Sequence, residues 1–241
     1  MLSRRESWCL LGSVWGASLL FLMGLTLADP DLWGHTLYGI RAIDRGILTE
    51  RSDPFSYTAD GAAWVNHEWL TEWQFGWLWT HIGNRGLVAW RNAWVLALWL
   101  VVACSFWKHR CGLGAGLLIL VLAAECLSDF VVFVRPQLAT FGLFALHLWL
   151  LRQVWDNPKN RWGWVLPPLM SLWVNLHGGF LAGLGVQAVF LVASAFGLRQ
   201  PIGWQRLQLF AGVFLCSSLA TLLNPWGWGL HEMLWHHLWT P

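Results

Sequence analysis

The sequence predicts an all-α fold: a polytopic transmembrane bundle of about seven spans, with two more helices at the membrane surface. Of the 241 residues, 56% are hydrophobic and 12% are charged, which is too little polar surface for a soluble globular protein of this length. The apolar stretches run for about 18 to 22 residues without strict alternation, as expected for helices that cross the hydrocarbon and not for a β-barrel. We expect one transmembrane domain over residues 1–241.

The charge and the cysteines exclude several classes of protein. The net charge of +2 comes mostly from short basic loops, so no nucleic-acid partner is expected. The five cysteines lie in or beside apolar segments, and their odd number without a pairing pattern argues against a disulfide framework. Signatures of soluble enzymes, such as a P-loop or a nucleophile elbow, are absent.

The positive-inside rule orients the chain. Arg4 and Arg5 precede a first span at about 9–28, which places the N-terminus in the cytoplasm and residues 29–86 outside. That span ends in Asp-Pro and not in a small-residue cleavage site, so we expect a retained signal-anchor helix. Further spans are expected near 87–107, 112–127, 137–153, 163–178, 181–198 and 207–223. This order keeps the basic residues of the later connections inside: Lys108, Arg110, Arg152, Lys159, Arg161, Arg199 and Arg206.

Two amphipathic helices are expected in the extracytoplasmic segment. Apolar residues recur at helical spacing from Leu32 to Ile47. Residues 67–82 carry five polar side chains among many tryptophans, which suits the headgroup region better than the hydrocarbon. Residues 48–66 contain Asp-Pro and Asp-Gly turn signals and are expected to form a loop.

Acidic residues are concentrated just after the first span. Residues 29–72 hold eight of the thirteen carboxylates, and acids beside a span mark a candidate site. Asp29 and Asp31 flank a proline, so they can share a cation or divide the roles of catalytic base and ligand. The alternative is helix capping by Asp29, with Asp31 in the first turn. Capping by Asp29 does not exclude catalysis by Asp31.

Other polar residues extend this candidate site. Asp31 and His35 lie four residues apart on one helical face, a spacing that permits joint metal ligation, although a solvated polar face explains it equally well. His35 is also a candidate for substrate binding. His67 and Glu68 open the second surface helix and are further candidate ligands for a divalent metal.

Three residues at later outer connections are candidates for substrate binding. Arg135, in Val-Arg-Pro-Gln, can hold a lipid phosphate; the alternatives are snorkelling or pairing with Asp129. Asn175 and His177 end a span before Gly178-Gly179, so they can contact a ligand or simply stabilise the turn.

The order of these features resembles the conserved module of GT-C glycosyltransferases, which include protein O-mannosyltransferases and aminoarabinose transferases. One span with an acidic motif at its outer end is followed by two surface helices. The chain is most similar to uncharacterised bacterial multi-pass members of this type. The motifs run from 29 to 228: Asp-Pro-Asp-Leu-Trp, Asp-Pro-Phe-Ser-Tyr-Thr, His-Glu-Trp-Leu, Arg-Pro-Gln, Asn-Leu-His-Gly and Asn-Pro-Trp-Gly.

The resemblance implies an inverting enzyme of the bacterial inner (plasma) membrane that takes a sugar from a polyprenyl-phosphate donor at the extracytoplasmic face. It implies a base or metal ligand at Asp29 or Asp31, a metal or substrate ligand at His67 or Glu68, and stabilisation of the leaving phosphate by Arg135 or a cation. The partners would be membrane lipids, the donor and an acceptor that the sequence does not identify. The alternative function is a non-catalytic membrane subunit that docks a partner protein.

Overall fold

The protein is almost entirely helical. The computed structural model describes residues 3–58, 60–197 and 203–239. Its helices are α1 (Arg4–Gly24), α2 (Leu32–Asp44), α3 (Trp69–Ile82), α4 (Asn84–His109), α5 (Leu113–Val131), α6 (Gln137–Asp156), the 3₁₀ helix η1 (Arg161–Val165), α7 (Leu166–Leu176), α8 (Phe180–Ala195), α9 (Trp204–Ala220) and α10 (Trp228–Trp239). Two short strands, β1 (Leu27–Ala28) and β2 (Phe133–Val134), form a parallel pair that the sequence did not predict.

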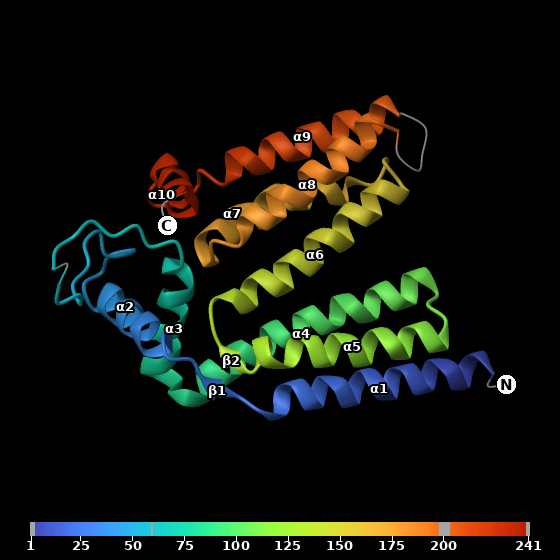
Figure 1. Ribbon diagram of the computed structural model, residues 1–241, viewed down its shortest axis with the longest axis horizontal. Coiled ribbons are helices and arrows are strands. Elements are labelled where there is room, and N and C mark those ends of the chain that lie inside the picture. Colours follow the sequence, from blue (N-terminus) through green and yellow to red (C-terminus); the bar gives the residue numbers. More distant parts are fainter. Residues whose placement is uncertain (1–2, 59, 198–202, 240–241) are drawn as a thin grey trace.

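The long helices lie side by side and run between the same two ends of the molecule (Figure 1). The N-terminus of α1 lies at one end of this bundle, and α2, α3, α10 and the strand pair lie at the other (Figure 1). We call the end with α2 and α3 the site end and the end with the N-terminus the basic end. The long helices run alternately toward the site end and toward the basic end (Figure 1).

Four helices of the described residues are long and apolar enough to cross a membrane: α1, α4, α5 and α6. Their outward surfaces are apolar; on α5, for example, Leu118, Val121 and Leu122 are all exposed. Exposed apolar side chains along a whole helix are typical of a surface that faces lipid. The membrane class is therefore supported.

The predicted count of seven spans is not confirmed. Helices α8 and α9 have 16 and 17 residues, and α7 has 11 residues preceded by the five of η1, all below the roughly 20 residues of an upright span. The two surface helices lie close to their predicted positions, as α2 and α3. Helix α10 was not predicted, and the predicted positions 198 and Arg199 lie outside the described residues.

A buried arginine joins three of the long helices at the site end. Arg91 of α4 is fully buried, and its guanidinium donates to the carbonyl oxygens of Val131, at the end of α5, and of Leu22, near the end of α1. It also donates to the carbonyl of Leu25, just beyond α1, at 3.0 Å. The last carbonyls of a helix have no partner within the helix. One side chain therefore caps two helix ends and fixes where β1 and β2 begin.

The register of the strand pair brings two site residues together. Leu27 pairs with Phe133 and Ala28 pairs with Val134. The next residues on the two parallel strands are Asp29 and Arg135, whose side chains form an ion pair.

Helices α2 and α3 cross with their backbones in contact. A Cβ atom on Gly39 would lie 1.8 Å from the carbonyl oxygen of Glu72, and one on Gly76 would lie 2.4 Å from the carbonyl carbon of Gly39. Glycine at both positions removes the side chains that would hold the helices apart. This close crossing places the first turn of α2 against the first turn of α3, where the site lies.

Candidate functional site

Glu68 is the centre of a cluster of histidines at the site end. It is the N-cap residue of α3, and its side chain is 11% exposed. Its carboxylate oxygens lie 3.5 Å from Nε2 of His35, 3.6 Å from Nε2 of His67 and 3.3 Å from Nε2 of His177. These histidines come from α2, from the loop before α3 and from the turn after α7. Three separate parts of the chain thus meet at one carboxylate.

His35 bridges two carboxylates. Its Nδ1 lies 3.0 Å from Oε1 of Glu72, while its Nε2 faces Glu68. Burial opposes the charged ring, but the hydrogen bond to Glu72 and the charges of Glu68, Glu72 and Asp31 raise the pKa of His35 above its ordinary value. The arrangement favours an imidazolium that donates from both nitrogens. The amide of Asn66 donates to the other oxygen of Glu72.

His177 is held as a neutral donor to Glu68. The backbone N–H of Gly179 donates to Nδ1 of His177 at 2.9 Å, and the hydroxyl of Thr140 lies 2.9 Å from the same nitrogen. Because Nδ1 accepts, this network assigns the ring proton to Nε2, which faces Glu68. A Cβ on Gly179 would lie 2.4 Å from Thr140 Oγ1, so glycine permits this close approach.

Burial sets the charge states of the cluster. It raises the pKa of Glu68 to about 7; the charge of His35 lowers it, and the charges of Glu72 and Asp31 raise it further. Burial also lowers the pKa of His67 and of His177 to about 4, so both are neutral at pH 7. The cluster therefore offers one carboxyl group that gains and loses a proton near neutral pH.

The two acids of Asp-Pro-Asp have different surroundings. Asp29 is buried, and both its oxygens are engaged: Oδ1 accepts the backbone N–H of Asp31 at 2.9 Å, and Oδ2 accepts from Arg135. Asp31 is exposed, and within the described residues no hydrogen bond or ion pair of its carboxylate is found. Asp29 thus holds the turn before α2 and the guanidinium of Arg135. Arg135 pairs with Asp29 and not with Asp129, the partner considered from the sequence.

Asn175 anchors α3 to the bundle. Its Oδ1 accepts from the indole of Trp69 at 2.7 Å, and its amide donates to the carbonyls of Ser171 and Leu223. The hydroxyl of Thr71 donates to the carbonyl of Leu176, at the end of α7, at 2.8 Å. All polar atoms of the Asn175 side chain are used in these contacts, whereas His177, two residues later, faces the cluster.

The proposed metal ligands do not form a ready-made site. Within the described residues, no group of three or more His, Cys, Asp or Glu side chains is arranged to hold a metal ion. Asp31, His67 and Glu68 lie at the same end of the molecule, and their donor types suit a divalent metal. However, Nε2 of His177 carries a proton, and both ring nitrogens of His35 face carboxylates. These two rings therefore have no nitrogen free to bind a metal ion. The divalent metal remains a prediction from the sequence.

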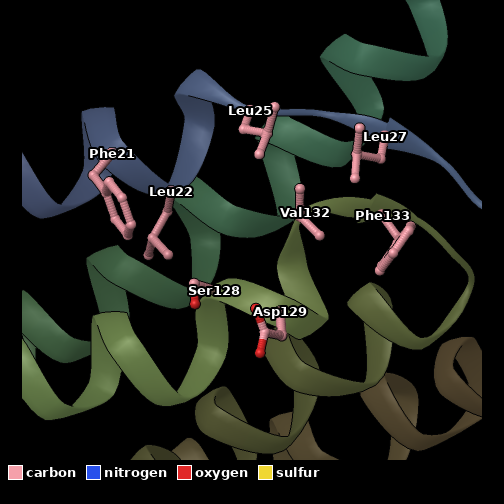
Figure 2. A pocket seen from close by; sticks show the side chains of 8 residues that line it. All are labelled: Phe21, Leu22, Leu25, Leu27, Ser128, Asp129, Val132 and Phe133. Atoms are coloured by element: carbon pink, nitrogen blue, oxygen red, sulfur yellow. The ribbon is translucent and has the colours of Figure 1, made fainter.

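A cavity of about 470 Å³ lies beside the strand pair. Its walls come from the ends of α1 and α5 and from both strands; Leu25, Leu27, Val132 and Phe133 are among its apolar residues, and Asp129 is at one side (Figure 2). The guanidinium of Arg135 lies over the ring of Phe133, 4.8 Å from its centre. An apolar cavity among candidate spans therefore ends next to a cation.

The sequence indicated most residues of the cluster but not the residues that hydrogen-bond to them. His35, His67, Glu68 and His177 were candidates, and all four converge. Three supporting residues were not assigned a role: Glu72, Asn66 and Thr140. Glu72 shares a helical face with Glu68, which was a usable signal. Nothing in the local sequence connects Asn66 or Thr140 to the site.

The fold and this cluster define a helical membrane protein with a buried carboxylate and histidine site outside its four candidate spans. No protein-family model, curated protein or solved structure matches the chain.

Proposed function

We propose that this protein is an inverting glycosyltransferase that moves a sugar from a polyprenyl-phosphate donor to an acceptor at the extracytoplasmic membrane surface. The observation that carries the proposal is Glu68: its pKa is about 7, and it is buried among three histidines at the site end, the end that also carries the pair of Asp29 and Arg135. A carboxylate tuned to neutral pH is suited to take a proton from a hydroxyl group. The seven-span topology, with residues 29–86 outside, belongs to the same proposal.

In this mechanism Glu68 is the general base. It accepts the proton of an acceptor hydroxyl as the hydroxyl oxygen forms a bond to the anomeric carbon of the donor sugar. The bond between that carbon and the phosphate oxygen breaks on the opposite face, and the lipid phosphate leaves with the electron pair. Arg135, oriented by Asp29, stabilises the charge on the leaving phosphate. Glu68 then loses its proton to water, and Asp31 faces the entering acceptor.

The cavity beside Phe133 supports a lipid donor. Its walls are mostly apolar and include the ends of two candidate spans, α1 and α5, so an isoprenoid chain can enter it from the hydrocarbon (Figure 2). A chain that ends there places its phosphate near the guanidinium over Phe133. The cavity, Arg135 and Glu68 all lie at the site end, so we propose that the lipid chain, the phosphate and the acceptor hydroxyl bind there together.

The test is donor turnover by the full chain in liposomes. A panel of polyprenyl phosphates that carry labelled hexoses or amino sugars is supplied, and the release of polyprenyl phosphate is measured. We expect Glu68→Gln to lower turnover by at least about 100-fold, the usual contribution of a general base. The matched control is Asp44→Asn, which removes an exposed acid from the far end of α2.

Two results would overturn the proposal. One is the absence of turnover with every donor, together with cell-surface glycans that are unchanged by Glu68→Gln. The other is equal loss of turnover in Glu68→Gln and Asp44→Asn. Absence of turnover combined with co-purification at fixed stoichiometry in a larger assembly would support the non-catalytic subunit instead.

A further inference from the structure

The basic end of the bundle carries a second set of cavities, far from Glu68. Three adjoining cavities of about 750, 730 and 220 Å³ lie where α1 begins and where α4 turns into α5. Arg110 lines all three, and Arg4 lines two of them. Trp8 and Trp107 form a wall of the largest, with ring centres 5.7 Å apart.

Positive charge at these cavities has little acidic compensation. Arg4, Arg5, Lys108 and Arg110 line them, and among the described residues no ion pair is found for any of the four. The nearby acid in sequence, Glu6, is used in a capping box with Ser3, where each residue bonds the backbone of the other. The basic side chains are thus available for an anion.

Arg110 is positioned by an unusual turn. It ends α4 in the left-handed conformation, with φ 48° and ψ 48°, where glycine is the usual residue. The backbone N–H of Cys111 bonds the carbonyl of Phe106 across this turn at 3.2 Å. The turn directs the chain from α4 into α5 and places the side chain of Arg110 between the cavities.

We propose that these cavities bind the headgroup of an anionic phospholipid, such as phosphatidylglycerol or cardiolipin, with arginines at the phosphate and the two tryptophans against the upper acyl chain. Arginine binds phosphate through a planar fork of donors, and basic pockets between membrane helices suit such headgroups. The tryptophans and exposed Cys9 favour an amphiphile over a free soluble anion, because a soluble anion gains nothing from apolar walls. This site does not depend on the proposed transferase activity.

The test is lipid binding by the purified full chain in detergent, followed by native mass spectrometry. We expect phosphatidylglycerol and cardiolipin to bind at least tenfold more tightly than phosphatidylcholine. A basic residue at an anionic surface contributes about fivefold, so Arg4→Gln, Arg5→Gln and Arg110→Asn together should weaken binding about 100-fold. Asparagine is chosen at position 110 because it tolerates the left-handed conformation.

The matched control removes three positive charges at the same end but away from the cavities. Arg152→Gln, Lys159→Gln and Arg161→Gln, all exposed, should leave phosphatidylglycerol affinity within about twofold. Equal losses in the two triple variants would overturn the proposal, since they would indicate general surface charge. Lack of preference for anionic lipid would overturn it too.

Two further variants keep the proposal testable if the first triple variant does not fold. The combination of Arg4→Lys, Arg5→Lys and Arg110→Lys keeps the charge but removes the fork of donors, and we expect partial loss of phosphatidylglycerol binding. Trp8→Ala with Trp107→Ala keeps every charge and should also weaken lipid binding. If glycerol phosphate or pyrophosphate in solution displaces the lipid at equal concentration, the site is one for soluble anions and the proposal fails.

Discussion

The close crossing of α2 and α3 makes a sharp prediction for Gly39→Ala. The new Cβ would lie 1.8 Å from the carbonyl oxygen of Glu72, where real contacts are at least 3.0 Å, so the helices must separate by about 1.2 Å. The hydrogen bond between His35 and Glu72, now 3.0 Å, would then exceed the usual limit.

The expected magnitude combines opposing effects. Loss of the hydrogen bond at buried Glu72 costs about 1–3 kcal/mol, and overpacking costs about 1–3 kcal/mol. Alanine regains about 1 kcal/mol through its higher helix propensity. We therefore expect a net loss of about 1–5 kcal/mol in unfolding free energy. Because His35 would separate from Glu72, its raised pKa should also fall toward the ordinary value.

Gly34→Ala is the matched control, because it lies on the same helix and a Cβ there would meet no heavy atom within 4 Å. It should stabilise the protein by up to about 1 kcal/mol. Thermal unfolding of the purified protein measures the change in stability, and NMR titration measures the change in the pKa of His35. The reasoning is refuted if Gly39→Ala is as stable as Gly34→Ala and leaves the His35 titration unchanged.

The same structure supports four other predictions. Donor turnover should rise about tenfold per pH unit up to about pH 7, where Glu68 loses its proton, and should be constant at higher pH. Glu68→Gln should abolish this rise. If the variant keeps the rise, another residue is the base. Folding raises the pKa of Glu68 from 4.5, so its contribution to stability is complete below pH 4.5 and is lost as the pH rises through 7. The unfolding free energy should fall by up to about 1.4 kcal/mol per pH unit over this range. Denaturation of Glu68→Gln at pH 5 and at pH 8 should lack this decline. Arg135→Ala leaves one oxygen of the buried Asp29 carboxylate without its partner and should cost about 1–3 kcal/mol, more than Asp29→Asn; equal costs in unfolding experiments would contradict this reasoning. Arg91→Leu leaves three carbonyls without their donor and should cost at least about 3 kcal/mol of unfolding free energy; a loss below 1 kcal/mol would contradict the clamp.

Local structure explains the roles of some acidic residues in this segment but not the role of Glu68. Glu50 is paired with Arg41 and Arg45, and Asp53 accepts the backbone N–H groups of two residues in its own turn. The sequence predicted the loop at 48–66 that holds both acids, but it did not predict the pairing of Glu50 with two arginines. Glu68 has no such local explanation, and its surroundings come from distant parts of the chain.

The sequence by itself determined most of the helices, the position of the acidic segment just after the first of them, and the short set of candidate residues. These follow from apolar run length, helical periodicity and loop charge, all of which are local properties. It also predicted the surface helices, because many polar residues in one short apolar segment are costly in hydrocarbon.

Only the tertiary structure decided which of the candidates act together. The bond from His35 to Glu72 joins residues 37 apart, and the pair of Asp29 and Arg135 joins residues 106 apart. These contacts depend on the glycine crossing of α2 and α3 and on the register of two strands of two residues each, too short to predict from pattern. The raised pKa of Glu68 has the same origin, because burial is a property of the packed molecule and not of the residue.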